Sequence, residues 1–472
     1  MNATYPLYLA GEFITTNDVL VVLDKYGNKD YATTYLADEK VLDYAIKKGI
    51  EAKDAMKLLS SLEKYEILFD IYSRIKAKRQ HLAEVLCIES AKPIRHALSE
   101  VDRSAQTFLI AAEECKRLPK EYMSLDWTPN GKNKEGIVKY FPIGLVAGIS
   151  PFNFPLNLAV HKIAPAIAAG CPIILKPASS TPLSTLELAK IISETKLPKG
   201  GLSILPMDRK TGNLLVTDER INLLSFTGSP EVGWEMKKQC GKKKVVLELG
   251  GNAGVIITPS ANFEDAVQKC LVGAFAYSGQ ICIHAQRLYV HESIFEKFKT
   301  AMVQKAKDLA FGNPLKQDTE ISDMIDEENS IRVENWIQQA TALGATLLCG
   351  GTRTGKFVEP TILTGTTEKM KVNCEEVFGP VICLESYTGA IENAIKKVNS
   401  TKFGLQCGVF TDSVAELTTS FEKIEVGGII HNDAPTLRFD QMPYGGIKDS
   451  GIGREGVKYA INDMLEHRIL VK

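Results

Sequence analysis

The segment Tyr277–Val290, with the sequence YSGQICIHAQRLYV, places one cysteine where a helix should end and a strand should begin. Ser278–Gln280 is expected to break the helix just before Cys282. A thiol at such a junction can meet free backbone N–H groups, which favour the thiolate and can bind an oxyanion. A free cysteine is more often a small buried hydrophobe. Cys282 is therefore a candidate nucleophile, and packing is the alternative.

Two further candidates stand where short apolar strands should stop, which is where open α/β sheets bind ligands. Glu248 ends VVLEL and precedes two glycines. A partly desolvated carboxylate there would have a raised pKa and could act as a general base, unless it pairs with a nearby lysine. Asn153 lies in PFNFP, whose two prolines should fix the position of its amide. The alternative is a turn asparagine that caps its own backbone.

Two more strand ends could contact a ligand. Lys176 ends PIILKP and could reach polar groups across the sheet, or lie on the surface as a snorkelling lysine. Thr181 and Pro182 resemble the N-cap and first residue of the next helix. Gly228 and Ser229 begin TGSPEVG, where a tight turn should expose the N-terminal N–H groups of a helix to an anion. A plain strand–turn–helix joint is the alternative.

The elements that must position these residues follow a changing pattern along the chain. Residues 40–120 have the three- and four-residue apolar spacing of successive helices. From about residue 135, short apolar strands such as GLVAGIS, PIILKP and INLLSF alternate with helical segments. A second region of the same kind begins near Asn262. This alternation predicts an α/β fold built from parallel βαβ units.

The composition is that of a soluble enzyme-sized chain. Its 472 residues are 44% hydrophobic and 24% charged, with a formal net charge of −1, which predicts two or three domains and no nucleic-acid partner. The ten cysteines are scattered without a CxxC, and the seven histidines lack zinc spacing, so reduced thiols and no metal are expected. No signal peptide and no apolar stretch of membrane-spanning length is evident. A cytoplasmic protein without a membrane partner is expected.

Seven motifs occur in a fixed order: PFNFP, LKPA, FTGS, LELGGN, GQIC, EEVFGP and PYGGIKDSGIGREG. Together they resemble the NAD(P)-dependent aldehyde dehydrogenase superfamily, and most of all its lactaldehyde-type subgroup, over essentially the whole chain. The resemblance implies a Rossmann-like dinucleotide-binding domain at 1–119 and 143–250. It further implies a second α/β catalytic domain at 251–446 and a β-strand oligomerisation arm at 120–142 and 456–472. A homodimer or homotetramer is expected.

The resemblance also assigns roles to individual residues. Cys282 matches the nucleophile, Asn153 with the backbone N–H of Cys282 matches the oxyanion hole, and Glu248 matches the base that activates water. The cofactor, NAD or NADP, is expected to contact Lys176, Ser179, Gly228, Ser229, Glu376 and Phe378. The implied reaction oxidises an aldehyde to a carboxylate through a thiohemiacetal and a thioester on the cysteine.

Departures from the family pattern bear on specificity. Many NAD-preferring relatives have an acidic residue where this chain has Ser179, so NADP is expected to be accepted, alone or alongside NAD. Non-phosphorylating glyceraldehyde-3-phosphate relatives have an arginine where this chain has Ile281, which argues against a phosphorylated triose.

Two residues resemble substrate-contacting positions of the lactaldehyde-type subgroup, namely Arg103 in EVDRSAQTF and His161 in NLAVHKIAP. They suggest a small aldehyde with a polar or anionic tail as the substrate. Arg103 could instead form a surface ion pair with Glu100 or Asp102, and His161 could be a satisfied core histidine.

Two other functions fit the same motifs. In a CoA-acylating relative, coenzyme A would take the acyl group, but such relatives often lack a base at the position of Glu248. In a catalytically silent structural relative, the cysteine or the base is usually lost, and here Cys282 and Glu248 are both present.

Overall fold

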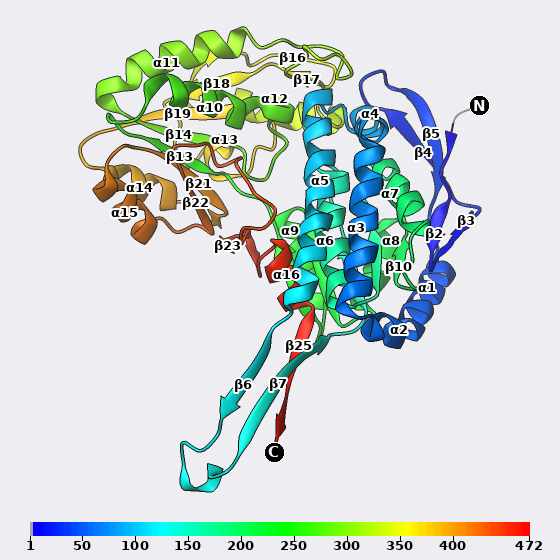
Figure 1. Cartoon of the computed structure of the whole chain (residues 1–472). Coiled ribbons are helices and arrows are strands. Elements are labelled where there is room, and N and C mark those ends of the chain that lie inside the picture. Colours follow the sequence, from blue (N-terminus) through cyan, green and yellow to red (C-terminus); the bar gives the residue numbers. More distant parts are fainter. Residues whose placement is uncertain (1–2) are drawn as a thin grey trace.

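A computed structural model describes residues 3–472 and contains two α/β units and a long β-ribbon (Figure 1). The ribbon projects away from the rest of the molecule, and the C-terminal strand runs along it. The α/β class, with two sheets that are mostly parallel, confirms the predicted fold class.

The sheet of the first unit has the strand order β24-β12-β11-β8-β9-β10-β2-β3. Its strands are β24 (Gly451–Ile452), β12 (Lys244–Glu248), β11 (Leu223–Thr227), β8 (Val146–Ile149), β9 (Ile173–Lys176), β10 (Leu202–Ile204), β2 (Leu7–Leu9) and β3 (Glu12–Ile14). The five strands from β12 to β10 are parallel, and the chain reverses its direction of progress between β8 and β11. Ligands bind at such a switch point, beyond the carboxyl ends of the strands.

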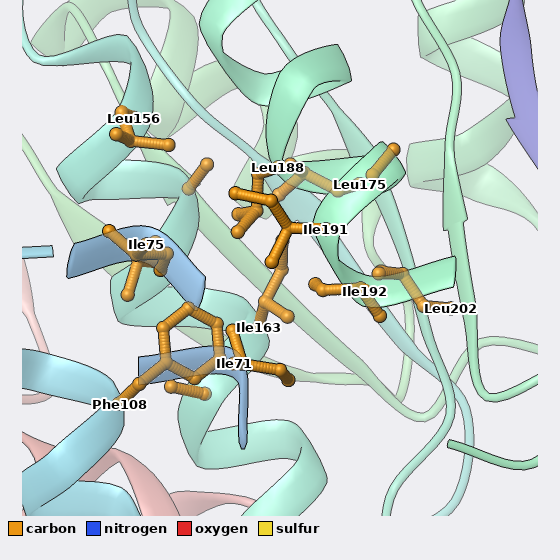
Figure 2. Close-up of a cluster of buried hydrophobic side chains, with 14 of the residues drawn as sticks. Ile71, Ile75, Phe108, Leu156, Ile163, Leu175, Leu188, Ile191, Ile192 and Leu202 are labelled. Carbon is orange, nitrogen blue, oxygen red and sulfur yellow. The ribbon is translucent and has the colours of Figure 1, made fainter. Parts of the chain in front are cut away.

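Helices cover both faces of this sheet. They are α1 (Glu39–Glu51), α2 (Lys53–Leu58), α3 (Ser61–Ala77), α4 (Arg79–Ser90), α5 (Ile94–Glu114), α6 (Pro155–Ala169), α7 (Leu183–Ser193), α8 (Arg209–Thr217), α9 (Pro230–Gln239) and α16 (Val457–Asp463). Figure 2 shows the core on one face, where Ile71 of α3 and Phe108 of α5 lie near Ile163 of α6. Helix α6 is buried, and it begins two residues after Asn153, so it gives this predicted site residue a rigid support.

The second unit contains a seven-stranded sheet in the order β15-β18-β19-β14-β13-β21-β22. Its strands are β15 (Thr346–Cys349), β18 (Thr361–Thr364), β19 (Val381–Tyr387), β14 (Arg287–His291), β13 (Gly254–Ile257), β21 (Gln406–Phe410) and β22 (Gly428–His431). Its helices are α10 (Phe263–Phe275), α11 (Glu292–Lys307), α12 (Glu327–Ala342), α13 (Lys371–Cys374), α14 (Ile391–Asn399) and α15 (Val414–Lys423). Strand pairing is parallel except between β15 and β18.

Three smaller β-structures complete the fold. The arm has the order β25-β7-β6 and comprises β6 (Lys120–Ser124), β7 (Glu135–Pro142) and β25 (Leu465–Val471). Near the N-terminus, β1 (Ala3–Thr4), β5 (Lys29–Tyr35) and β4 (Val19–Asp24) form a small sheet. Two two-stranded ladders pair β16 (Arg353–Thr354) with β17 (Phe357–Val358) and β20 (Phe403–Gly404) with β23 (Ile447–Lys448).

The arm differs from the predicted boundaries at its second segment. α16 belongs to the core of the first unit, because Val457, Ile461 and Met464 are buried there. The strand that pairs with β7 begins at Leu465, nine residues after the predicted start at 456. The amphipathic helix α16 precedes the strand, and its apolar residues pack into the core of the first unit before the chain continues into the arm.

One predicted helix cap is wrong. α7 begins at Leu183, and the Thr181 hydroxyl donates to the Phe152 carbonyl at 3.4 Å and does not cap the helix. The Glu89 carboxylate of α4 accepts the N–H groups of Leu183 and Ser184, at 2.7 and 2.9 Å. A buried carboxylate from a distant helix therefore takes the place of the local hydroxyl.

No helix within residues 3–472 is both long enough and apolar enough to cross a membrane. Over the same residues, no group of three or more cysteine, histidine or acidic side chains is placed to hold a metal ion. All ten cysteines are free thiols.

Candidate active site

A cavity of about 330 Å³ lies at the switch point of the first sheet and is closed from the other side by the second unit. Seven of the residues predicted from the sequence line it: Asn153, Gly228, Ser229, Glu248, Cys282, Glu376 and Phe378. Asn153 and Glu248 follow or end strands of the first unit, whereas Cys282 and Glu376 belong to the second. Lys176, Ser179, Arg103 and His161 lie outside this lining.

The segment before Cys282 has an unusual backbone. Tyr277, Ser278 and Gly279 have consecutive φ angles of 50°, 53° and 68°, in the left-handed region. For the two residues with a Cβ this conformation costs roughly 1–2 kcal/mol each. At Gly279 a Cβ would lie 2.1 Å from the Gly379 carbonyl oxygen, so only glycine fits. The chain is thus bent sharply just before the thiol.

Hydrogen bonds to distant parts of the chain hold this bend. The Tyr277 hydroxyl donates to the Ser90 carbonyl at 3.1 Å, and the Ser278 hydroxyl donates to the Ser322 carbonyl at 2.5 Å. Local strain persists where surrounding contacts over-determine the backbone, and it is common at functional sites.

Cys282 itself is half-buried and lines the cavity. Burial raises the pKa of its thiol to about 11, and a hydrogen bond with Tyr444 opposes part of that rise. The Sγ–Oη distance is 3.0 Å. Tyr444 was not predicted as a site residue: it belongs to the motif PYGGIKDSGIGREG, but it lies 162 residues from Cys282 in the sequence, and the motif alone does not indicate this contact.

Asn153 is buried, and its amide is fixed by the loop that carries the thiol. The Nδ2 atom donates to the Gln280 carbonyl at 3.0 Å, so the alternative of a turn asparagine capping its own backbone is wrong. An amide nitrogen has two N–H groups, and the second is left for the cavity. Behind the turn, the Lys92 ammonium donates to the Asn153 carbonyl at 2.7 Å.

Lys92 belongs to a buried ion pair that also holds the start of α6. Lys92 pairs with Glu100 of α5, and both side chains are fully buried. The other Glu100 oxygen accepts the N–H groups of Leu156 and Asn157, at 3.0 and 3.1 Å. The Lys92 ammonium also lies 3.9 Å from the centre of the Phe154 ring, a cation–π contact. α5 therefore fixes the turn that presents Asn153.

Glu248 ends β12 with both carboxylate oxygens buried and without a hydrogen-bond partner among residues 3–472. Burial, and then repulsion from Glu455, raise the pKa of Glu248 well above its usual value. The alternative in which Glu248 pairs with a lysine is wrong. Lys162 instead contacts Glu455 at 3.1 Å and Thr227 at 2.6 Å. A buried carboxyl group with a raised pKa suits proton transfer near neutral pH.

Glu455 is the charged counterpart of Glu248. It accepts from Arg438 at 2.9 Å and from Lys162. Although burial acts in the opposite direction, these two cations lower the pKa of Glu455 to about 2. Glu455 therefore stays ionised, while Glu248 is held toward its protonated form.

Arg103 and His161 meet at a residue that was not predicted. The Arg103 guanidinium bonds both Asp440 oxygens, at 3.2 and 2.6 Å, and His161 Nε2 lies 2.8 Å from the same carboxylate. The alternative pairing of Arg103 with Glu100 or Asp102 is wrong, because Lys92 and Arg79 occupy those partners. Burial, and then Arg438, lower the pKa of His161, so its imidazole is neutral.

The lining of the cavity also includes groups suited to sugar hydroxyls. The Glu376 carboxylate accepts the N–H of Gly251 at 3.2 Å, and burial raises its pKa to about 8. Phe378 has a φ of 47°, and the Phe152 ring meets its ring edge-on at 5.8 Å.

A helix N-terminus and a lysine lie at the same edge of the first sheet, at the carboxyl ends of β11 and β9. Ser229 is the N-cap of α9, but its side chain makes no capping bond, so the first N–H groups of the helix are free. Lys176 ends β9, and its ammonium has no hydrogen-bond partner anywhere in the described chain. Burial lowers the pKa of Lys176. An anion site, a lysine and a carboxylate acceptor fit the phosphates and riboses of a dinucleotide.

Comparison with known proteins supports the same interpretation. The model of the aldehyde dehydrogenase family matches residues 13–470. A 3-sulfolactaldehyde dehydrogenase of Priestia aryabhattai is 41% identical over 469 residues, covering 99% of this chain and 98% of the relative. A lactaldehyde dehydrogenase of Methanococcus aeolicus is 39% identical over 472 residues, covering 98% and 99%.

Solved structures agree in fold. Aldehyde dehydrogenase 21 from Physcomitrella patens, solved in complex with the reaction product succinate, is 44% identical with a TM-score of 0.98 and covers 100% of this chain and 98% of its own. Other similar structures are complexed with NADP or with NAD+. The chain therefore belongs to the aldehyde dehydrogenase family and is an NAD(P)-dependent aldehyde dehydrogenase of the lactaldehyde type.

Proposed function

We propose that this enzyme oxidises a small aldehyde with a polar or anionic tail to the carboxylate, with Cys282 as nucleophile. Asn153 and the backbone N–H of Cys282 form the oxyanion hole, and Glu248 is the base for hydrolysis. One observation carries the proposal: a half-buried thiol, a fixed amide and an unpaired carboxyl group from two different sheets line one cavity.

The chemistry follows from these groups. The Cys282 sulfur attacks the aldehyde carbon, and the oxygen that becomes negative accepts the free Asn153 N–H. NAD(P), when bound, supplies the hydride acceptor. Glu248 then takes a proton from a water molecule that attacks the resulting thioester, which releases the carboxylate and the thiol. The thiol thus divides one difficult oxidation into two easier steps.

The cofactor is assigned to the groups around the α9 N-terminus. Lys176 and Glu376 would bond the two riboses, Gly228 and Ser229 the pyrophosphate, and Phe378 would pack beside the nicotinamide ribose. Ser179 is half-buried in the turn after β9, and its hydroxyl has no hydrogen-bond partner among residues 3–472. A free hydroxyl carries no negative charge that would repel a 2′-phosphate, and it can donate a hydrogen bond to that group. We therefore propose that NADP is used, alone or alongside NAD.

The charge balance of the buried cluster around Asp440 and Glu455 favours an anionic tail. Three cations, Arg103, Lys162 and Arg438, contact only two ionised carboxylates, Asp440 and Glu455. The cluster therefore has one positive charge in excess, and the Arg438 Nε atom is buried without a partner. A substrate carboxylate or sulfonate would neutralise it. The sulfolactaldehyde-oxidising relative and the succinate-bound relative both point to such tails.

We also propose the domain division and assembly. The dinucleotide-binding domain would comprise 1–119 and 143–250, the catalytic domain 251–446, and the arm 120–142 with the strand from Leu465 onward. The open edges of β6 and β25 would pair with a second copy in a homodimer or homotetramer. Ten free thiols favour a reducing compartment, which we take to be the cytoplasm.

A substrate panel tests the proposal. We expect NAD(P) reduction, followed by absorbance, with sulfolactaldehyde, lactaldehyde and succinic semialdehyde, and slower turnover of propanal and glyceraldehyde 3-phosphate. Cys282→Ser should abolish turnover. Arg103→Ala should raise KM for the anionic aldehydes roughly tenfold and leave KM for propanal within about twofold, since a charge-assisted contact contributes about 1.5–3 kcal/mol.

Arg79→Ala is the matched control, because Arg79 forms the same two-bond pair with Asp102 on the outer surface. Equal effects of Arg103→Ala on anionic and neutral aldehydes would remove Arg103 as an anchor. Unchanged oxidation by Cys282→Ser would refute the nucleophile. Formation of an acyl-CoA when coenzyme A is added would favour a CoA-acylating enzyme. A wild type that shows no activity with any aldehyde would favour a catalytically silent structural relative.

A further inference from the structure

The phenol of Tyr444 is buried directly against the thiol. The side chain of Tyr444 is almost inaccessible to solvent, and its Oη atom lies 3.0 Å from Cys282 Sγ. Among residues 3–472, Sγ is the only hydrogen-bond partner of this hydroxyl. An unpaired buried hydroxyl is costly, so the contact satisfies a group that would otherwise have no partner.

The backbone and ring of Tyr444 are held in place. Its N–H donates to the Glu455 carbonyl at 3.0 Å, and the Glu455 N–H donates back at 2.6 Å. The Arg438 guanidinium lies over the ring, 3.7 Å from its centre, and pairs with the Glu455 carboxylate. The phenol therefore cannot swing away from Cys282 without breaking these contacts.

When the Cys282 thiol ionises, the phenol of Tyr444 keeps its own proton and becomes the hydrogen-bond donor of the contact. Burial raises the pKa of Tyr444 well above its ordinary value, and the pKa of the Cys282 thiol is about 11. The other charged groups that face the thiol are Glu376, Arg438 and Glu248. The two carboxyl groups oppose ionisation of the thiol, and Arg438 favours it. Among residues 3–472, Tyr444 is the group that shares a hydrogen bond with Sγ.

We propose that Tyr444 is a catalytic residue that donates its O–H to the Cys282 sulfur whenever that sulfur is negative. The inference rests on the proposed role of Cys282 as nucleophile. Tyr444 would act twice in each cycle, because the sulfur carries charge before it attacks and again when it leaves.

The electron balance fixes these two moments. In the attack, a sulfur lone pair forms the C–S bond and the carbonyl π pair moves onto oxygen. Hydride then leaves with two electrons, which reduces NAD(P) and oxidises the carbon to a thioester. In hydrolysis, water forms the new C–O bond, its proton passes to Glu248, and the C–S pair returns to Sγ. Tyr444 stabilises the sulfur at the start and at the end.

Tyr444→Phe removes the donor and keeps the ring. A hydrogen bond to a charged group contributes enough to raise the thiol pKa by about one to two units. Higher nucleophilicity of the more basic thiolate offsets about half of this effect. We therefore expect alkylation of Cys282 by iodoacetamide between pH 7 and 9 to slow roughly three- to tenfold, read by mass spectrometry of its peptide. kcat should fall several-fold while KM for NAD(P) is unchanged.

Tyr289→Phe is the matched control, since Tyr289 of β14 is also buried but lies outside the cavity, where its hydroxyl contacts Arg287 and the Lys397 carbonyl of α14. Replacement of Tyr444 by 3-fluorotyrosine gives a test in the other direction: the more acidic phenol should accelerate alkylation. That second substitution also decides the matter if Tyr444→Phe does not fold.

The role of Tyr444 and the proposed aldehyde oxidation can be tested separately. Unchanged alkylation and kcat in Tyr444→Phe, with an active wild type, would overturn the role of Tyr444 and leave the proposed function standing. A wild type that oxidises no aldehyde would overturn the proposed function. The alkylation rates, measured without cofactor or aldehyde, would still show whether Tyr444 contacts the thiolate.

Discussion

Ser179 lies three residues beyond Lys176, where the chain leaves β9, and we expect the charge at this position to influence which cofactor is used. Ser179→Glu would place a carboxylate where a 2′-phosphate would lie, and like-charge contact is costly. We expect kcat/KM for NADP to fall at least tenfold, while kcat/KM for NAD changes less than about threefold. Initial rates at varied cofactor concentration measure both.

Ser180→Glu is the control, because Ser180 is the next residue of the same half-buried turn. Equal losses for both cofactors, or equal effects of the two substitutions, would contradict the assignment of Ser179.

The sequence identified the residues whose motifs carry chemistry, but not their partners. Glu248 and Asn153 stand at or just after strand ends, where a polar residue after an apolar run is conspicuous, and Cys282 stands where a helical segment is broken before a strand. Tyr444 and Asp440 carry no such signal, because each lies in an irregular segment and meets its partner across 162 and 337 residues. Contacts of that range depend on how the two units pack, which no local pattern encodes.

Elements were predictable where their apolar spacing was long and regular. β11 and β12 were recognised within about two residues, because both are continuous apolar runs. α8 was not recognised, since RKTGNLLVT is short and contains a glycine. The cap of α7 was misassigned to Thr181, because its real partner, Glu89, belongs to another helix.

The buried pair of Lys92 and Glu100 gives a prediction for α5 and α6. Lys92→Met would leave Glu100 as an uncompensated buried charge, and breaking a buried pair costs about 3–5 kcal/mol. We expect the free energy of unfolding to fall by that order, measured by urea denaturation. kcat should also fall, because the Asn153 carbonyl loses its donor.

Lys238→Met serves as the reference for that change, since Lys238 and Glu235 form an exposed pair on α9. Its effect should stay within about 0.5 kcal/mol. If Lys92→Met were as mild as Lys238→Met, the buried pair would not support the turn that carries Asn153.

At the scale of the whole molecule, the arm predicts an assembly. β25 pairs with β7 on one side, and Glu135 and Lys472 exchange both backbone hydrogen bonds. By the alternation of an antiparallel ladder, the N–H of Ile469 points to the open edge. Ile469→Pro should therefore block pairing with a second copy without breaking the pairing to β7.

Light scattering should show a dimer or tetramer for the wild type and a smaller species for Ile469→Pro. Leu470→Ala is the control, because Leu470 is also exposed, yet its N–H faces β7 and the change retains every backbone donor. A monomeric wild type would contradict the assembly, and an undiminished assembly in Ile469→Pro would show that the open edge of β25 is not used.

A short segment near the C-terminus joins the two units in a way that bears on their motion. Ile447–Lys448 pairs with β20 of the second unit, and four residues later Gly451–Ile452 pairs with β12 of the first, with Gly451 directly opposite Glu248. These two pairings connect the second unit to the strand that ends in Glu248, which restricts a hinge motion between Cys282 and Glu248. We therefore expect substrate to enter through movements of side chains and loops at the rim of the cavity, and the distance between the Cys282 sulfur and the Glu248 carboxyl group to change little during turnover.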